Sequence, residues 1–159
     1  MRIELLHPLV VHFPIALLLI GVLLRCIALF LKRSELYPYV MVSSWIILGI
    51  GVCCAWLAVL AGEFAADVVG KNLCQPNILQ DHKKLAYTAA ILFTCALLLD
   101  WGKMWGKNYF SPLFNKVIGV TRFVLFLAAT VILLSAAYFG GSLVYEQGAA
   151  VEKRCTQAN

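Results

Sequence analysis

Four long apolar stretches constrain this sequence more than any other feature. They extend from about Leu9 to Leu31, from Tyr39 to Ala61, from Leu85 to Leu99 and from Val117 to Ser142. A helix of about 20 apolar residues crosses the hydrocarbon core of a bilayer, so the first, second and fourth stretches are long enough to do so. The third is shorter, but Tyr87 and Trp101 can anchor its ends at the two membrane interfaces.

The composition supports the same interpretation. Hydrophobic residues make up 62% of the chain and charged residues 13%, whereas a soluble domain is about half apolar and about a quarter charged. None of the four stretches has a polar face, which argues against a soluble helical bundle. We therefore predict an all-α fold, a four-helix transmembrane bundle. It forms a single domain over residues 1–159, with spans at about 9–31, 39–61, 84–101 and 117–141.

Several other classes of protein fit the sequence poorly. The first stretch is predicted to be a retained helix rather than a signal peptide, because its apolar run is too long and it lacks a small-residue cleavage site. The net charge of +5 does not indicate nucleic-acid binding, because the basic residues are scattered between the apolar stretches. The sequence has no GxSxG motif and no glycine-rich phosphate loop, so we do not expect an enzyme. No internal repeat is recognised.

The charges between the spans predict the orientation. Four spans place both termini and the segment 62–83 on one side, and the connections 32–38 and 102–116 on the other. The second side carries seven basic residues and two acids, namely Arg25, Lys32, Arg33, Lys103, Lys107, Lys116 and Arg122, with Glu35 and Asp100. The side of the termini carries six basic residues, so the totals differ little. Five of the seven on the second side lie in its two short connections, close to the helix ends, where Lys and Arg favour the cytoplasm. We therefore place the two connections in the cytoplasm and both termini outside.

The six cysteines divide between two environments. Four lie within the spans and are expected to behave as small apolar residues, namely Cys26, Cys53, Cys54 and Cys95. Cys74 and Cys155 lie outside the spans, on the side of the termini. In an oxidising compartment these two can form a disulfide, and two free thiols are the alternative. No CxxCH motif occurs, which excludes covalently attached c-type haem.

Polar side chains that can hold a ligand gather at the end of the predicted bundle where the termini lie. His7 and His12 open the first span, His82 opens the third, and Glu63 and Asp67 follow the second. His12 stands inside an apolar run, and an ionisable residue within a span is a candidate functional residue.

Pro14 affects this end of the chain, because it cannot donate a helical hydrogen bond to the carbonyl of Val10. We expect either a kink at this point or an irregular segment over residues 8–12. Irregular backbone at membrane depth must be buried in protein or line a cavity. Both alternatives predict that His12 turns into the bundle.

Small residues occur at the same depth on the second, third and fourth spans. Small residues allow close helix packing, and the alternative is that they leave room for a flat cofactor. His82, Ala86, Ala89 and Phe93 share one helical face by their spacing. A histidine beside small residues on one face is the arrangement that the edge of a porphyrin needs.

Two motifs near the ends of the chain are distinctive. The first is His7-Pro8-Leu9-Val10-Val11-His12-Phe13-Pro14-Ile15-Ala16-Leu17, and the second is Gly140-Gly141-Ser142-Leu143-Val144-Tyr145 with Gly148. Both resemble signatures of a bacterial membrane family named domain of unknown function 2231, and Ala61-Gly62 and His82 also fit its layout. The resemblance covers nearly the whole chain. It implies a four-span bacterial membrane protein without an assigned activity. Together with the orientation inferred from the charges, this predicts an inner-membrane protein with the termini and the segment 62–83 in the periplasm.

The resemblance also implies a redox setting. Some members of that family are joined to, or placed beside, Rieske or c-type cytochrome domains. The expected partners are therefore the lipid bilayer and another membrane or periplasmic redox protein, with oligomerisation left open. Gln147 stands where many relatives are expected to have a histidine or another residue, so it is not taken as a ligand.

Three hypotheses about function remain open at this point. In the first, His12 and His82 are the axial ligands of a b-type haem, with His7 as a further cofactor-binding residue. In the second, His7, His12, Glu63 and His82 bind a zinc, iron, copper or nickel ion. In the third, which fits the sequence best, the chain is an accessory or structural membrane subunit. Its histidines then cap helices and bond to Glu63, Asp67 or backbone carbonyls.

One structural quantity separates the first two hypotheses. A metal–nitrogen bond to histidine is about 2 Å long, so two imidazoles that face each other across an ion have similar spacing with or without a porphyrin. The distance between the rings is therefore not decisive. The empty volume beside the rings is decisive, because a porphyrin needs far more space than a bare ion.

Overall fold

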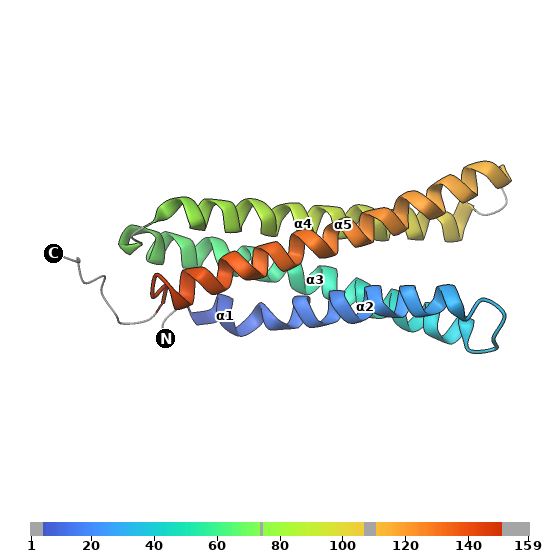
Figure 1. Cartoon of the computed structure of the whole chain (residues 1–159), viewed down its shortest axis with the longest axis horizontal. Helices are drawn as coiled ribbons and strands as arrows, with labels where there is room; N and C mark the ends of the chain where they lie inside the picture. Colours follow the sequence, from blue (N-terminus) through green and yellow to red (C-terminus); the bar gives the residue numbers. More distant parts are fainter. Residues whose placement is uncertain (1–4, 74, 107–110, 151–159) are drawn as a thin grey trace.

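The computed structural model describes residues 5–73, 75–106 and 111–150, which form a bundle of long helices (Figure 1). In chain order the elements are α1 (Leu6–Val10), α2 (His12–Phe30), α3 (Tyr37–Val69), the 3-10 turn η2 (Gly70–Asn72), α4 (Pro76–Gly106) and α5 (Pro112–Tyr145). No strand occurs within these described ranges. The predicted all-α fold is therefore confirmed.

Four helical segments of the described chain are long and apolar enough to cross a membrane, namely Leu6–Phe30, Tyr37–Val69, Pro76–Gly102 and Pro112–Tyr145. α3 has 33 residues and α5 has 34. At a rise of about 1.5 Å per residue, each is about 50 Å long. The hydrocarbon core is about 30 Å thick, so both helices extend beyond it.

The connections between the spans are shorter than the sequence indicates. The segment 62–83 was expected to be a connection, but α3 continues through Glu63 and Asp67 to Val69, and α4 begins at Pro76. A helix satisfies its own backbone hydrogen bonds in water as it does in lipid. The helices therefore continue past the ends of the apolar stretches on which the predicted bounds were based.

The first span is interrupted at Val11, between α1 and α2. The N–H of Val11 donates to the carbonyl of His7 at 3.0 Å, and the N–H of Ile15 reaches the carbonyl of Val11 at 3.5 Å. Pro14 has no N–H to donate one turn back. An interruption near Pro14 is therefore present, but the alternative of an irregular segment over residues 8–12 is not observed, because Leu6–Val10 is helical and Val11 keeps helical φ and ψ angles of −62° and −26°.

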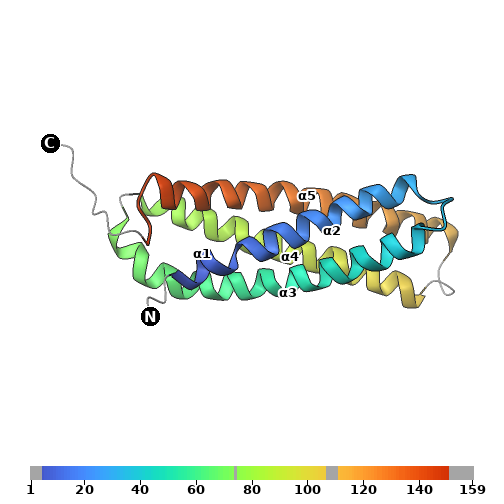
Figure 2. The same cartoon turned by 90° about the horizontal axis from the view of Figure 1, so that it is seen from below.

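The bundle consists of two antiparallel helical hairpins. α1 and α2 pack against α3, and α4 packs against α5. Figures 1 and 2 show the start of α1 and the end of α5 at one end of the molecule, together with the connection between α3 and α4. The end of α2 and the start of α3, and likewise the end of α4 and the start of α5, lie at the opposite end (Figure 1). We call these the terminal end and the connection end.

The core of the bundle is centred on four side chains that are at most 1% exposed, namely Leu18, Leu48, Phe93 and Phe126. Two glycines bring α2 and α3 close together. A Cβ atom at Gly21 would lie 2.5 Å from Cγ of Leu48, and one at Gly51 would lie 2.9 Å from Cδ2 of Leu18. Small residues at such contacts are typical of packed membrane helices.

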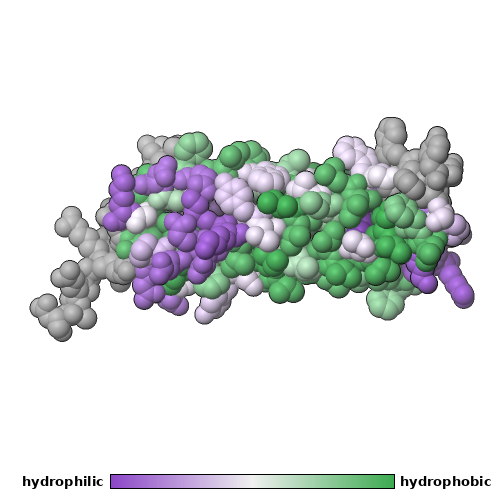
Figure 3. Space-filling view, turned by 90° about the horizontal axis from the view of Figure 1, so that it is seen from above, coloured by the Kyte–Doolittle hydropathy of each residue, from purple (hydrophilic) through white to green (hydrophobic). Residues whose placement is uncertain are grey.

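Large hydrophobic side chains cover the outside of the bundle. Phe30, Leu113 and Tyr138 are among those that are strongly exposed. The face seen in Figure 3 is hydrophobic along the middle, with hydrophilic residues gathered toward the two ends. Soluble monomers rarely expose such a continuous apolar surface. The chain is thus built as a multi-pass membrane protein.

Candidate functional site

His7 connects α1 to α3 near the terminal end. Its Nδ1 lies 2.8 Å from the carbonyl oxygen of Ala58. One turn further along α3, Gly62 leaves space for the ring, because a Cβ atom there would lie 3.1 Å from both Nδ1 and Cε1 of His7. A carbonyl and a glycine one turn apart therefore form a notch that receives this imidazole.

His82 makes the same arrangement between α4 and α5. Its Nδ1 lies 2.9 Å from the carbonyl oxygen of Ala136. A Cβ atom at Gly140, one turn further along α5, would lie 3.0 Å from Cε1 of the ring. Each hairpin thus holds one histidine in a notch of its second long helix.

The carbonyl contacts define what each histidine can offer a ligand. A carbonyl oxygen only accepts, so Nδ1 of His7 and Nδ1 of His82 each donate their proton to it, and in a neutral ring the lone pair is on Nε2. Among the described residues, neither Nε2 has a hydrogen-bond partner. Metal-binding histidines are commonly oriented in this way, by a backbone carbonyl on the nitrogen that does not bind the metal.

The two histidines face a common small cavity. Their ring centroids lie 6.0 Å apart with the rings at 81° to one another. The cavity has a volume of about 60 Å³, and the rest of its lining is apolar, with many alanines: Ala55, Ala58, Ala86, Ala89, Ala90, Ala136 and Ala137. The predicted face of α4 is confirmed, because His82, Ala86 and Ala89 line the cavity and Phe93 is buried below it.

His12 is not part of this pair. Its side chain is exposed, and its Nδ1 lies 2.9 Å from the carbonyl oxygen of Pro8 in the preceding turn. It does not line the cavity that His7 and His82 share. The expected turn of His12 into the bundle is therefore not observed. His7 shares a helical face with Val11, Pro14 and Leu18, which also line the cavity, and His12 lies on a different face.

The acidic residues of the terminal end do not complete a metal site. Glu63 accepts from Nζ of Lys83 at 2.7 Å, with both side chains partly exposed, and Asp67 is exposed. In the described part of the chain, no group of three or more His, Cys, Asp or Glu residues lies close enough to hold a metal ion. The four residues named for a metal site, His7, His12, Glu63 and His82, are thus not brought together as one set.

Two further expectations concern residues near this end. Cys74 and Cys155, the predicted disulfide partners, lie outside the described residues. Gln147, which was not taken as a ligand, accepts a hydrogen bond at its Oε1 from the backbone N–H of Gln75 at 3.1 Å. This contact fastens the end of α5 to the connection between α3 and α4.

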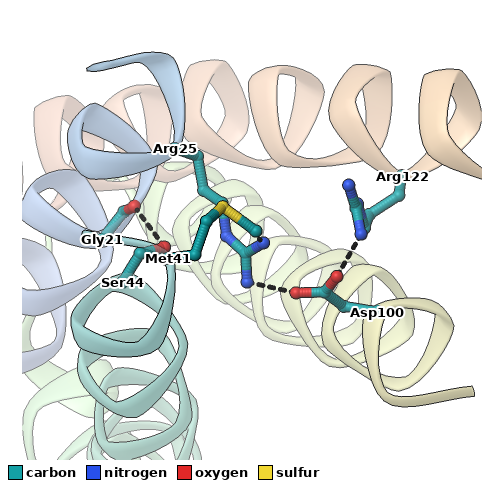
Figure 4. Close-up of polar contacts among 6 residues, drawn as sticks. All are labelled: Gly21, Arg25, Met41, Ser44, Asp100 and Arg122. Carbon is teal, nitrogen blue, oxygen red and sulfur yellow. Dashed lines mark hydrogen bonds and ion pairs between the residues drawn. The ribbon is translucent and has the colours of Figure 1, made fainter. Parts of the chain in front are cut away.

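A second polar cluster, toward the connection end, is an ion triad of Arg25, Asp100 and Arg122 (Figure 4). Asp100 of α4 accepts from NH2 of Arg25 on α2 and from NH1 of Arg122 on α5. Arg25 and Asp100 are 5% and 7% exposed, and Arg122 is 17% exposed. NH1 of Arg25 also lies 3.7 Å from Sδ of Met41. The triad therefore joins three helices inside the bundle.

The sequence analysis treated these three residues as charges that set orientation and did not recognise their contact. Arg25 and Arg122 are not unpaired basic residues, because they share one carboxylate. The signal that could have identified them is their position. Each lies within, or at the edge of, an apolar stretch, where ionisable residues are normally paired.

Comparison with known protein families finds a match. The family described as "Predicted membrane protein (DUF2231)" matches residues 4–153. No curated protein and no solved structure matches the chain. The family match covers the histidine pair, the ion triad and all four candidate spans. The chain therefore belongs to the membrane protein family DUF2231.

Proposed function

We propose that this chain is an accessory subunit of a bacterial inner-membrane redox assembly, and that it binds one metal ion between His7 and His82. One observation carries the proposal. Two imidazoles from different hairpins are fixed through Nδ1 by backbone carbonyls, and each has an Nε2 without a hydrogen-bond partner among the described residues, beside a shared cavity.

The volume of the cavity favours an ion over a haem. An engineered cavity that binds benzene has a volume of about 150 Å³, and the cavity here has about 60 Å³. A porphyrin is several times larger than benzene, so it could enter only if the two hairpins moved apart. An ion that bonds both Nε2 atoms at about 2 Å requires ring centroids no more than about 6.5 Å apart, and the observed 6.0 Å satisfies this limit.

Monovalent copper fits the ligand set best. Imidazole nitrogen suits zinc, copper, iron and nickel. Divalent ions of these metals require about four ligands or more, whereas the described residues provide two histidines and no third ligand. Monovalent copper is stable with two nitrogen ligands in a nearly linear arrangement. It also exchanges one electron, which suits a redox assembly.

The experiment is copper binding by the full-length protein purified in detergent. The protein is titrated anaerobically with Cu(I) in competition with a chromogenic chelator, and bound copper is measured by elemental analysis. We expect one copper per chain for the wild type. We expect loss of binding in His7→Ala and in His82→Ala, because each substitution removes one of the two ligands.

His12→Ala is the matched control, since it removes a histidine of the same motif that faces away from the cavity. It should keep one copper per chain. Less than a stoichiometric amount of copper in the wild type would contradict the proposal. So would a Soret absorption band after expression with ample haem, which would favour haem instead.

A purely structural role is the second candidate, and a specific observation favours it. The hydrogen bonds from His7 to Ala58 and from His82 to Ala136 each join two helices, so the histidines can serve to hold the bundle together without any ligand. In this role, His7→Ala and His82→Ala lower the melting temperature, and the wild type binds no copper. The same set of variants therefore separates the two candidates.

A further inference from the structure

The two histidine notches are equivalent in position as well as in geometry. In each hairpin the histidine lies near the start of the first span and bonds to an alanine carbonyl on the second. A glycine one turn further on accommodates the ring. His7 and His82 have the same separation along the chain as Arg25 and Asp100, which are 75 residues apart.

The same register relates the core residues of the two hairpins. Leu18 of α2 and Phe93 of α4 are both buried in the core, and they have the same separation along the chain as His7 and His82. On α3 and α5, the second helices of the two hairpins, the buried pair Leu48 and Phe126 also has a fixed separation along the chain. The same separation relates the alanines whose carbonyls accept from the histidines and the glycines beside the rings, namely Ala58 with Ala136 and Gly62 with Gly140. Positions that hold a histidine, accept its hydrogen bond or lie in the core in one hairpin thus do so in the other.

The cavity lies where these equivalent positions meet. Its lining contains both members of several pairs, among them His7 with His82, Val11 with Ala86, and Pro14 with Ala89. A space bounded by matching residues of two similar units lies on the axis that relates them. Both hairpins start at the terminal end (Figure 1), so this pseudo-two-fold axis runs along the membrane normal, as in other parallel repeats.

The ion triad is a place inside the bundle where the two hairpins differ in charge. Arg25 corresponds to Asp100, Ser44 to Arg122, and Met41 to Gly119. Ser44 is completely buried and donates to the carbonyl of Gly21 at 3.2 Å, so this position holds no charge in the first hairpin (Figure 4). If like hairpins paired, Arg25 would face a second Arg25, and Asp100 a second Asp100. Such charge repulsion is a standard way to exclude wrong partners.

We infer that the chain is a tandem duplication of one two-helix unit, and that the triad of Arg25, Asp100 and Arg122 makes the two unlike copies pair. This inference does not depend on what the cavity binds. In a low-dielectric bundle, an unpaired buried charge is strongly destabilising, so the triad favours one pairing and penalises the alternatives.

Exchange of equivalent residues tests the inference on the full-length protein. A full exchange carries Arg25→Asp, Met41→Gly, Ser44→Arg, Asp100→Arg, Gly119→Met and Arg122→Ser, which moves the triad to the equivalent position on the other side of the axis. A partial exchange carries only Arg25→Asp and Asp100→Arg. It leaves Arg122 beside the new arginine and away from the new acid.

We expect the full exchange to have the higher melting temperature of the two, although it carries more substitutions. The reason is that only the full exchange places two arginines around one carboxylate. If the full exchange is no more stable than the partial exchange, or if it alone fails to fold, the pseudo-symmetric origin of the triad is contradicted.

A distance measurement tests the axis without reference to stability. In a chain whose other cysteines are replaced, spin labels at the exposed Cys53 and Cys95 report one distance. Labels at the exposed positions of Ile20→Cys and Val131→Cys occupy the equivalent pair. A pseudo-two-fold axis requires the two distances to be the same within the width of the label distributions. Clearly different distances would overturn the duplication.

Discussion

The positions of the two histidine rings depend on two glycines. Gly62 and Gly140 each stand against an imidazole ring, and a Cβ at either position would lie 3.0–3.1 Å from ring atoms. The rings cannot move away freely, because their Nδ1 atoms are bonded to Ala58 and Ala136. These glycines therefore fix how deeply each ring enters its notch.

Gly140→Ala should displace His82. We expect the free energy of unfolding to fall by about 1–3 kcal/mol, the usual range for an overpacked site, because the added methyl group competes with the ring held by the Ala136 carbonyl. The measurement is denaturant unfolding in detergent.

Gly49→Ala is the control for this substitution, because a Cβ at Gly49 meets nothing within 4 Å. It should leave the stability unchanged or raise it by about 0.5–1 kcal/mol through the better helix propensity of alanine. Equal effects of the two substitutions would mean that the notch around His82 does not restrict the ring.

The site could be predicted only in part from single residues. The helical period placed His82, Ala86 and Ala89 on one face, and they line the cavity. The period also puts His7 on one face with Val11, Pro14 and Leu18, which line the cavity, but it does not specify whether this face or that of His12 turns inward. That direction is fixed by the bond from His7 to α3, a contact between segments far apart in the sequence.

At the scale of the helices, α2 and α3 lock together through reciprocal contacts. Gly21 receives Leu48, and Gly51 receives Leu18. The second hairpin has larger residues at the equivalent positions, with Ala96 and Ala129 in place of the glycines and Phe93 and Phe126 in place of the leucines. α3 is also joined to α4 by the bond from Trp56 Nε1 to Thr94 Oγ1 at 3.1 Å.

Gly21→Ala should separate α2 from α3. The added Cβ would lie 2.5 Å from Cγ of Leu48, and Leu48 is completely buried, so the leucine has nowhere to move. We expect a loss of at least about 1–3 kcal/mol in the free energy of unfolding. Unfolding in detergent measures it, with Gly49→Ala again as the control. A stability equal to that of the control would disprove this close contact.

Over the whole molecule, the two ends of the bundle have different roles. The terminal end holds the histidine pair and its cavity, whereas the ion triad lies toward the connection end and joins α2, α4 and α5. Arg25 and Asp100 belong to different hairpins, as do His7 and His82. Contacts between the hairpins are thus formed by ionisable residues toward both ends and by apolar residues in the middle.

Asp100→Asn should destabilise the bundle strongly. It removes the only carboxylate that Arg25 and Arg122 are seen to contact in the described structure, and leaves two facing cations. Loss of one partner from a buried ion pair costs about 3–5 kcal/mol. The melting temperature in detergent measures the effect.

Glu63→Gln provides the comparison for this substitution, because it breaks the partly exposed pair with Lys83. An exposed ion pair contributes about 0–1 kcal/mol, so this variant should unfold nearly as the wild type does. Similar losses in Asp100→Asn and Glu63→Gln would mean that the triad is no more important than a surface pair.

The orientation of the whole molecule is also testable. The basic residues of the connections predict that the terminal end lies in the periplasm. Alkaline phosphatase fused to the C-terminus should therefore be active, and green fluorescent protein fused there should not fluoresce. An inactive phosphatase and a fluorescent protein at the C-terminus, with the opposite result for fusions within residues 32–38, would show that the topology is the reverse of the predicted one.

The sequence by itself determined the class of fold, because apolar stretches of membrane-spanning length allow little other than a helical bundle. It also indicated that polar residues gather at the terminal end and that one face of α4 carries small residues. Tertiary structure decided which histidines meet, how small their cavity is and that Arg25, Asp100 and Arg122 share one site. These features depend on helix rotation and on contacts across the bundle, which the helical period of one segment does not specify.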